Sequence, residues 1–145
     1  MMKTGRRIAF DYGQVRIGVA ASDLSGLIAS PIATLQASDV ALSEKLREIV
    51  AEYEPIYLVV GEPKHLSGAS SPSLLAAHEF GELLGSITDI PIHFVDERMS
   101  TISAARTLRG AGRNAKESKS EIDAMAAVAI LESALERERI AGYLD

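Results

Sequence analysis

The fold is decided by the stretch Arg7-Ile8-Ala9-Phe10-Asp11-Tyr12-Gly13-Gln14-Val15-Arg16-Ile17-Gly18-Val19-Ala20. Two short apolar runs flank a polar turn at 12–15, a pattern that predicts a β-hairpin. Gly13 can adopt a positive φ, as a tight turn often requires. Further strands and helices are expected to assemble around this hairpin.

Asp11 stands where the first strand of this hairpin ends. A carboxylate at the inner end of a strand costs free energy unless a metal ion or a basic side chain compensates it. Two readings follow from the residues alone. Asp11 is either a metal ligand or a turn-forming residue that pairs with Arg16, since aspartate also favours turns.

Composition indicates one soluble domain over residues 1–145. The chain has 145 residues, of which 47% are apolar and 24% charged, and its net charge is −5. The absence of cysteine excludes disulfides and thiolate metal sites. No apolar run approaches the roughly 18 residues of a membrane span, and the N-terminus lacks a signal-peptide pattern. We therefore expect a cytoplasmic protein without membrane contact.

The remaining chain predicts an α/β fold. Strands are expected at 29–35, 56–60 and 91–95, the first at an edge because of Pro31 and the second buried on both faces. Helices are expected from Asp39 or Ser43 to about 53, from a Ser71 cap to about 85, from 100 to about 108, and from about 120 to 139. The result is a five-stranded mixed sheet, its first three strands antiparallel, flanked by about four helices.

Three carboxylates are candidates for one site. Asp11 and Glu97 each follow a strand, and Asp123 is expected in the first turn of the last helix. Three carboxylates gather only around a cation, and Mg²⁺ or Mn²⁺ is the natural ion for oxygen ligands. Alternatives remain for each residue: Asp123 could complement the helix dipole, and Glu97 could pair with Arg98 or cap a helix.

Four motifs, in order along nearly the whole chain, resemble the YqgF/RuvX family. They are Ala9-Phe10-Asp11-Tyr12-Gly13 with Arg16-Ile17-Gly18-Val19-Ala20 and Ser22-Asp23; Val60-Gly61 with Pro63, Leu66 and Gly68; Val95-Asp96-Glu97-Arg98 with Ser100-Thr101 and Ala104; and Ile122-Asp123-Ala124 with Ala126-Ala127 and Ile130-Leu131. The chain departs from the family pattern at Glu62, Lys64 and Ser100.

The resemblance implies an RNase H-like fold and a metal-dependent nuclease, a hydrolase that acts as an endonuclease on phosphodiester bonds. Two metal ions at such carboxylates could activate a water and stabilise the leaving oxygen. It implies Asp11, Glu97 and Asp123 as catalytic residues and ligands of Mg²⁺ or Mn²⁺. It also implies a role in ribosome biogenesis, the maturation of the 5′ end of 16S ribosomal RNA. The alternatives are a Holliday junction resolvase, which would act as a homodimer, and a non-catalytic nucleic-acid-binding module. A sugar or acetate kinase-like ATPase fragment is disfavoured by the short chain.

Nucleic-acid binding is assigned to a basic segment, because the whole chain is acidic. From Arg98 to Lys119 there are six basic residues against one acidic residue. The predicted contacts are Arg16, Arg98, Arg106, Arg109, Arg113, Lys116 and Lys119, and the loop with Gly61, Pro63 and Gly68 is expected to form a lip of the groove. Alternatively, the loop is a plain connector, or binding lies around Arg6, Arg7, Arg16 and that loop. The histidines at 65, 78 and 93 have no metal-ligand spacing, which indicates structural roles.

Overall fold

The computed structural model describes residues 2–63, 71–96 and 115–142. Its sheet contains five strands in the order β3-β2-β1-β4-β5. The elements are β1 (Arg7–Tyr12), β2 (Arg16–Ser22), β3 (Ala29–Gln36), α1 (Leu42–Tyr53), β4 (Tyr57–Glu62), α2 (Pro72–Ile87), β5 (Ile92–Asp96) and α4 (Ala115–Ala141). The helix predicted at 100–108 lies outside the described residues.

The strand directions confirm the predicted mixed sheet. β2 is antiparallel to both β1 and β3, whereas β4 is parallel to β1 and to β5. The carboxyl ends of β1, β4 and β5 therefore lie at one edge of the sheet, where open sheets of this kind carry their ligand sites.

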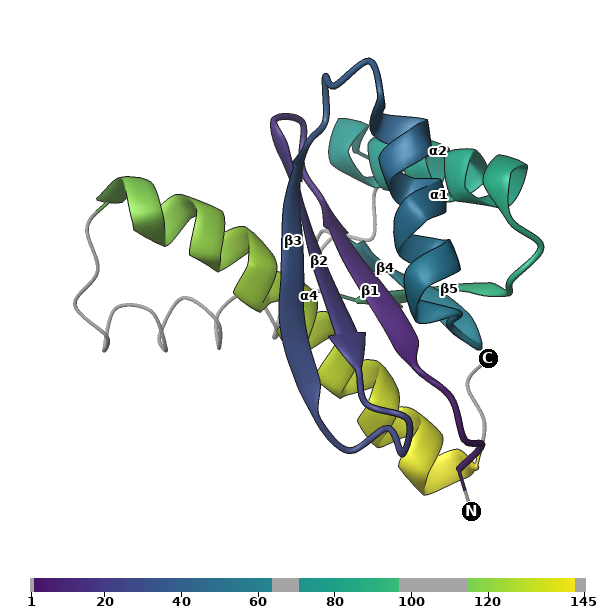
Figure 1. Ribbon diagram of the computed structural model, residues 1–145. Coiled ribbons are helices and arrows are strands. Elements are labelled where there is room, and N and C mark those ends of the chain that lie inside the picture. Colours follow the sequence, from purple (N-terminus) through teal and green to yellow (C-terminus); the bar gives the residue numbers. More distant parts are fainter. Residues whose placement is uncertain (1, 64–70, 97–114, 143–145) are drawn as a thin grey trace.

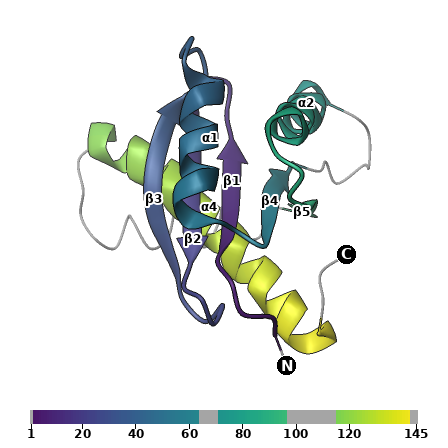
Figure 2. The same ribbon diagram turned by 45° about the vertical axis from the view of Figure 1, so that its right-hand side comes forward.

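Helices cover both faces of the sheet (Figure 1; Figure 2). Successive strand residues point to opposite faces. Accordingly, Ile8 and Phe10 of β1 lie in a core with α1 and α2, and Ala9 lies in a second core with α4. Small and apolar residues of α4 make that second contact; the buried ones include Ala127, Val128, Ile130, Leu131 and Ala134.

The predicted hairpin is present as β1 and β2, paired from Ile8 with Ala21 to Tyr12 with Ile17. Gly13 suits the turn because the backbone carbonyl of Arg16 lies too close to its α-carbon to leave room for a side chain. Its N–H donates to the carbonyl of Arg16 at 2.9 Å, and a Cβ at Gly13 would lie 2.7 Å from that oxygen. The positive φ considered from the sequence is not used at Gly13.

Several local predictions are confirmed. β3 is an edge strand, and Pro31 lies next to an irregularity in its pairing with β2. β4 is an inner strand, buried from residue 57 to residue 61. Ser71 caps α2, since its Oγ accepts the N–H of Leu74 at 3.1 Å, with Pro72 in the first turn.

Helix ends differ from the predictions. The N-cap of α1 is Ala41, without a side-chain cap, so the expectation of Asp39 or Ser43 is wrong. The Asp39 carboxylate instead accepts the N–H of Ala41 and pairs with Lys45. α2 runs past residue 85 to Ile87, and α4 begins at 115 rather than about 120. Local propensity marks the ends of a helix only weakly, so both helices extend beyond the residues at which the sequence pattern weakens.

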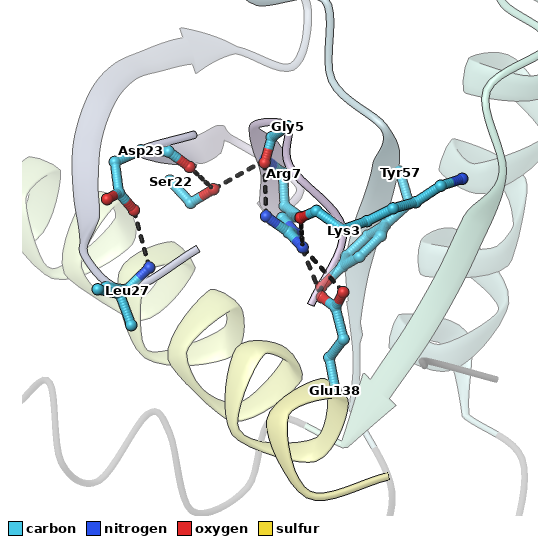
Figure 3. Close-up of polar contacts among 8 residues, drawn as sticks. All are labelled: Lys3, Gly5, Arg7, Ser22, Asp23, Leu27, Tyr57 and Glu138. Carbon is cyan, nitrogen blue, oxygen red and sulfur yellow. Dashed lines mark hydrogen bonds and ion pairs between the residues drawn. The ribbon is translucent and has the colours of Figure 1, made fainter. Parts of the chain in front are cut away.

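The turn between β2 and β3 is organised by one carboxylate (Figure 3). Asp23 accepts the hydroxyl of Ser25 at 2.6 Å and the N–H groups of Leu27 and Ile28 at 2.8 and 3.0 Å. The Ser25 hydroxyl, followed by these backbone donors, lowers the pKa of Asp23 to about 2, because hydrogen bonds to the charged form favour it.

A buried ion pair joins β1 to the last helix at the end of the sheet where β1 begins (Figure 3). Arg7 is 0% exposed and donates through Nε and Nη2 to the two carboxylate oxygens of Glu138, at 3.2 and 2.8 Å. Tyr57 donates its hydroxyl to Glu138 at 2.8 Å. Burial, then this hydrogen bond, raises the pKa of Tyr57 above its usual value. Arg7 is thus occupied inside the protein and is excluded from the alternative nucleic-acid surface.

Among the helices of the described ranges, none has the length and apolar character that a membrane span requires.

Candidate functional site

Asp11 is positioned by the register of β1 at the edge where the parallel strands end. Phe10 pairs with Val60 of β4, and Glu62 at the end of β4 pairs with Asp96 at the end of β5. Because Ala9 faces α4, alternation directs Asp11 to the same face. Asp11 is therefore part of a strand and not of the turn.

Gly18 brings the last helix into contact with this position. It pairs with Asp11 across the hairpin. A Cβ at Gly18 would lie only 1.9 Å from the carbonyl oxygen of Asp123 and 2.3 Å from its carbonyl carbon. The backbone of α4 thus lies directly on β2 at a place that only glycine permits. The structure places Asp123 beside the cross-strand partner of Asp11.

Asp123 lies deeper in its helix than predicted. Because α4 begins at Ala115, Asp123 is its ninth residue, and the expectation of a place in the first turn is wrong. The macrodipole acts within the first turn of a helix, so the alternative role of complementing the dipole is also removed. Packing of the small residues of α4 on the sheet, not capping, decides where Asp123 lies.

The side chain of Asp123 forms an ion pair with Arg16. The Nε of Arg16 donates to Oδ2 of Asp123 at 2.6 Å, and the two side chains are 31% and 23% exposed. The sequence suggested Arg16 as a nucleic-acid contact or as a partner of Asp11. Its contact with Asp123, 107 residues away, has no signal in local sequence patterns.

The two described carboxylates fit a hard divalent cation in donor chemistry. Asp11 and Asp123 supply oxygen ligands, which Mg²⁺ and Mn²⁺ prefer, and both lie next to Gly18, Asp11 as its strand partner and Asp123 in close backbone contact with it. Within the described ranges, no group of three His, Cys, Asp or Glu side chains could hold a metal. Glu97, the third predicted ligand, follows β5 directly and lies outside the described residues.

A second polar pair near the same edge was missed from the sequence. Glu62, at the end of β4, forms a hydrogen bond with His78 of α2, in which Oε2 of Glu62 lies 2.6 Å from Nε2 of His78. The imidazole also stacks on Phe94 of β5, with ring centroids 4.4 Å apart. These residues lie on the face that α2 covers, opposite Asp11. The carboxylate of Glu62, which departs from the family pattern, therefore has a structural partner.

The other predicted residues are only partly described. Gly61 is buried in β4, and Pro63 follows that strand. Lys116 and Lys119 belong to the first turns of α4, whose beginning extends past the β3 edge of the sheet (Figure 1; Figure 2). Outside the described residues lie Gly68, Arg98, Arg106, Arg109 and Arg113, as does the histidine at 65. The remaining histidine, at 93, contacts Tyr57 edge to face.

Comparison with known proteins supports the sequence resemblance. A family model, RuvX, described as "Holliday junction resolvase", matches residues 5–137. A protein of Streptomyces coelicolor named "Putative pre-16S rRNA nuclease" is 46% identical over 143 residues, which are 97% of this chain and 86% of that protein. A protein of Cutibacterium acnes with the same name is 45% identical and covers 94% of this chain and 85% of its own length.

The fold is also that of a solved structure. The structure "T. thermophilus RuvC in complex with Holliday junction substrate" superimposes with a TM-score of 0.64 at 15% identity, covering 94% of this chain and 96% of that chain. This likeness identifies the fold as RNase H-like.

Proposed function

Because this chain belongs to the RuvX family, we propose that it is a metal-dependent nuclease that matures the 5′ end of 16S ribosomal RNA. One observation carries the proposal. The close contact of α4 with Gly18 places Asp123 beside the strand partner of Asp11, at the edge where the parallel strands end. The names of the relatives support ribosomal RNA as the substrate class, and the two carboxylates near one edge of the sheet support a metal site there.

The proposed chemistry assigns a role to each group. Asp11, Asp123 and Glu97 would hold the metal through their carboxylate oxygens. When bound, Mg²⁺ or Mn²⁺ supplies an activated water and stabilises the negative charge on the leaving oxygen of a phosphodiester. Arg16, Arg98, Arg106, Arg109, Arg113, Lys116 and Lys119 are proposed to bind the phosphate backbone, with the loop after β4 as one lip of the groove.

A second candidate is a Holliday junction resolvase. The description of the matching family model favours it. Junction resolution requires two symmetric nicks and therefore a homodimer, whereas maturation of one RNA end does not. The oligomeric state at working concentration, measured by analytical ultracentrifugation, bears on this choice.

The proposal is tested by cleavage of two substrates, a precursor 16S RNA fragment and a four-way DNA junction, in Mg²⁺, in Mn²⁺ and in EDTA. We expect cleavage of the RNA with metal, and losses of orders of magnitude for Asp11→Asn, Glu97→Gln and Asp123→Asn. Asp89→Asn is the matched control, because Asp89 is exposed and lies between α2 and β5, before the strand begins. Circular dichroism checks that each variant is folded.

Three results would change the conclusion. If Asp11→Asn cleaves as fast as the parent, the carboxylate site is not the catalytic centre. If the junction is cut and the RNA is not, the protein is a resolvase. If neither substrate is cut or nicked although both bind, the non-catalytic binding module is favoured instead.

A further inference from the structure

The candidate site contains a cation of its own, the guanidinium of Arg16. We propose that Arg16 is the internal counter-ion of Asp123, which both holds this carboxylate in place and lowers the affinity of the site for a divalent metal ion. The inference rests on the proposed function, since it assumes that Asp123 is a metal ligand. It assigns to Arg16 a positioning role in addition to the proposed contact with phosphate.

The backbones of both partners are fixed before their side chains meet. Arg16 is the first residue of β2, and its carbonyl accepts the N–H of Gly13 at 2.9 Å. The neighbouring carbonyl of Val15 accepts the N–H of Ala37, also at 2.9 Å. On the other side, the close approach to Gly18 fixes the backbone of Asp123. The ion pair therefore joins two rigid elements and is not a chance contact of mobile loops.

Partial burial makes the attraction between Arg16 and Asp123 stronger than that of an ordinary ion pair at the surface. The side chains are 31% and 23% exposed, and Nε lies 2.6 Å from Oδ2. Exposed ion pairs contribute little because water screens them. Here the pair is partly shielded, and Asp11 adds a second negative charge on the neighbouring strand. The guanidinium offsets the repulsion that two nearby carboxylates would otherwise experience.

The same charge opposes a metal ion at Asp123. A divalent cation bound by this carboxylate would lie within a few ångströms of the guanidinium, and like charges at that distance repel strongly in a partly buried site. Removing the charge of Arg16 should therefore strengthen metal binding, even though it removes a contact that holds Asp123. A residue that only positioned Asp123 would have the opposite effect on metal affinity, and a residue that only bound phosphate would have none.

The test is a titration with Mn²⁺ alone, followed by isothermal calorimetry, in buffer without nucleic acid. The proteins are the parent, Arg16→Gln, Arg16→Lys and Arg47→Gln. Arg47 is an exposed residue of α1 on the far face of the sheet, so its variant loses the same charge away from the site. We expect Arg16→Gln to bind Mn²⁺ at least about tenfold more tightly, equivalent to about 1.4 kcal/mol. Arg16→Lys and Arg47→Gln should stay near the parent.

Thermal unfolding in EDTA gives a second readout. Arg16→Gln should unfold at a lower temperature than the parent, because the ion pair is lost and the carboxylates repel each other. Tighter Mn²⁺ binding combined with a lower melting temperature supports the proposal. If Arg16→Gln does not fold, Arg16→Met, which is also neutral and retains a long side chain, takes its place.

The failures are distinguishable. Equal or weaker Mn²⁺ binding by the neutral variants, with binding by the parent that Asp123→Asn abolishes, overturns the role of Arg16 and leaves the metal site intact. If the parent itself binds no Mn²⁺, the proposed metal centre fails and the inference fails with it.

Discussion

Gly18→Ala tests the contact that builds the candidate site. The added Cβ would lie 1.9 Å from the carbonyl oxygen of Asp123, and ordinary contact begins at 3.4 Å, so the two backbones must separate by about 1.5 Å. The obstacle is helix backbone, which cannot rotate away as a side chain can. Ala20, the next residue of β2 on this face, lies in the core that α4 covers, so a displaced helix also loses buried contacts.

Overpacking of this kind costs about 1–3 kcal/mol, and the rigid obstacle places Gly18→Ala at the upper end of that range. Alanine recovers about 0.5–1 kcal/mol of backbone entropy relative to glycine, so we expect a net loss of about 2 kcal/mol. For a chain of this size the melting temperature should fall by roughly 4–8 °C. Urea unfolding followed by circular dichroism measures the free energy of unfolding directly.

Gly85→Ala is the control for this experiment. Its Cβ would have a single neighbour within 4 Å, the Cδ1 of Ile92 at 3.9 Å, and Gly85 is an exposed residue of α2. We expect this variant to be neutral or slightly stabilised. If Gly18→Ala is as stable as Gly85→Ala and binds Mn²⁺ like the parent, α4 does not rest on β2 as described, and the site has been assembled incorrectly.

Two further predictions concern the opposite end of the sheet and the turn after β2. Glu138→Gln leaves the buried charge of Arg7 without its partner and should reduce the free energy of unfolding by about 3–5 kcal/mol. Glu136→Gln, which removes an exposed carboxylate, should change it by less than about 1 kcal/mol in the same urea experiment. Because the Ser25 hydroxyl and backbone donors lower the pKa of Asp23, the stability that this carboxylate contributes is complete above its ordinary value of 3.8. It is lost as the pH falls through about 2. Amide signals of this turn, followed by NMR, should titrate with that low midpoint, and a midpoint near 3.8 would contradict the hydrogen bonds.

Local pattern was enough to predict most of the elements. The β1–β2 hairpin joins neighbours in the sequence, and the run at 56–60 is apolar throughout, so both predictions depended on residues a few positions apart. The Ser71 cap is local in the same way. Asp11 could be identified as a candidate for the same reason, because a carboxylate directly follows apolar strand residues.

The surroundings of the candidate site depended on tertiary structure. Arg16 meets Asp123 across 107 residues, and Arg7 meets Glu138 across 131. These two ion pairs depend on the order of the strands and on the path of α4 over the sheet. Neither the strand order nor that path can be predicted from the periodicity of residues along the chain. The start of α4 was misplaced because local propensity marks the beginning of a helix only weakly. The residue of α4 that lies beside the strand partner of Asp11 is decided by packing of the small residues of α4 on the sheet and by the close contact with Gly18. The sequence by itself therefore determined the five strands, the three described helices and the candidate carboxylates, and only the tertiary structure decided the partners of Asp123 and Arg7.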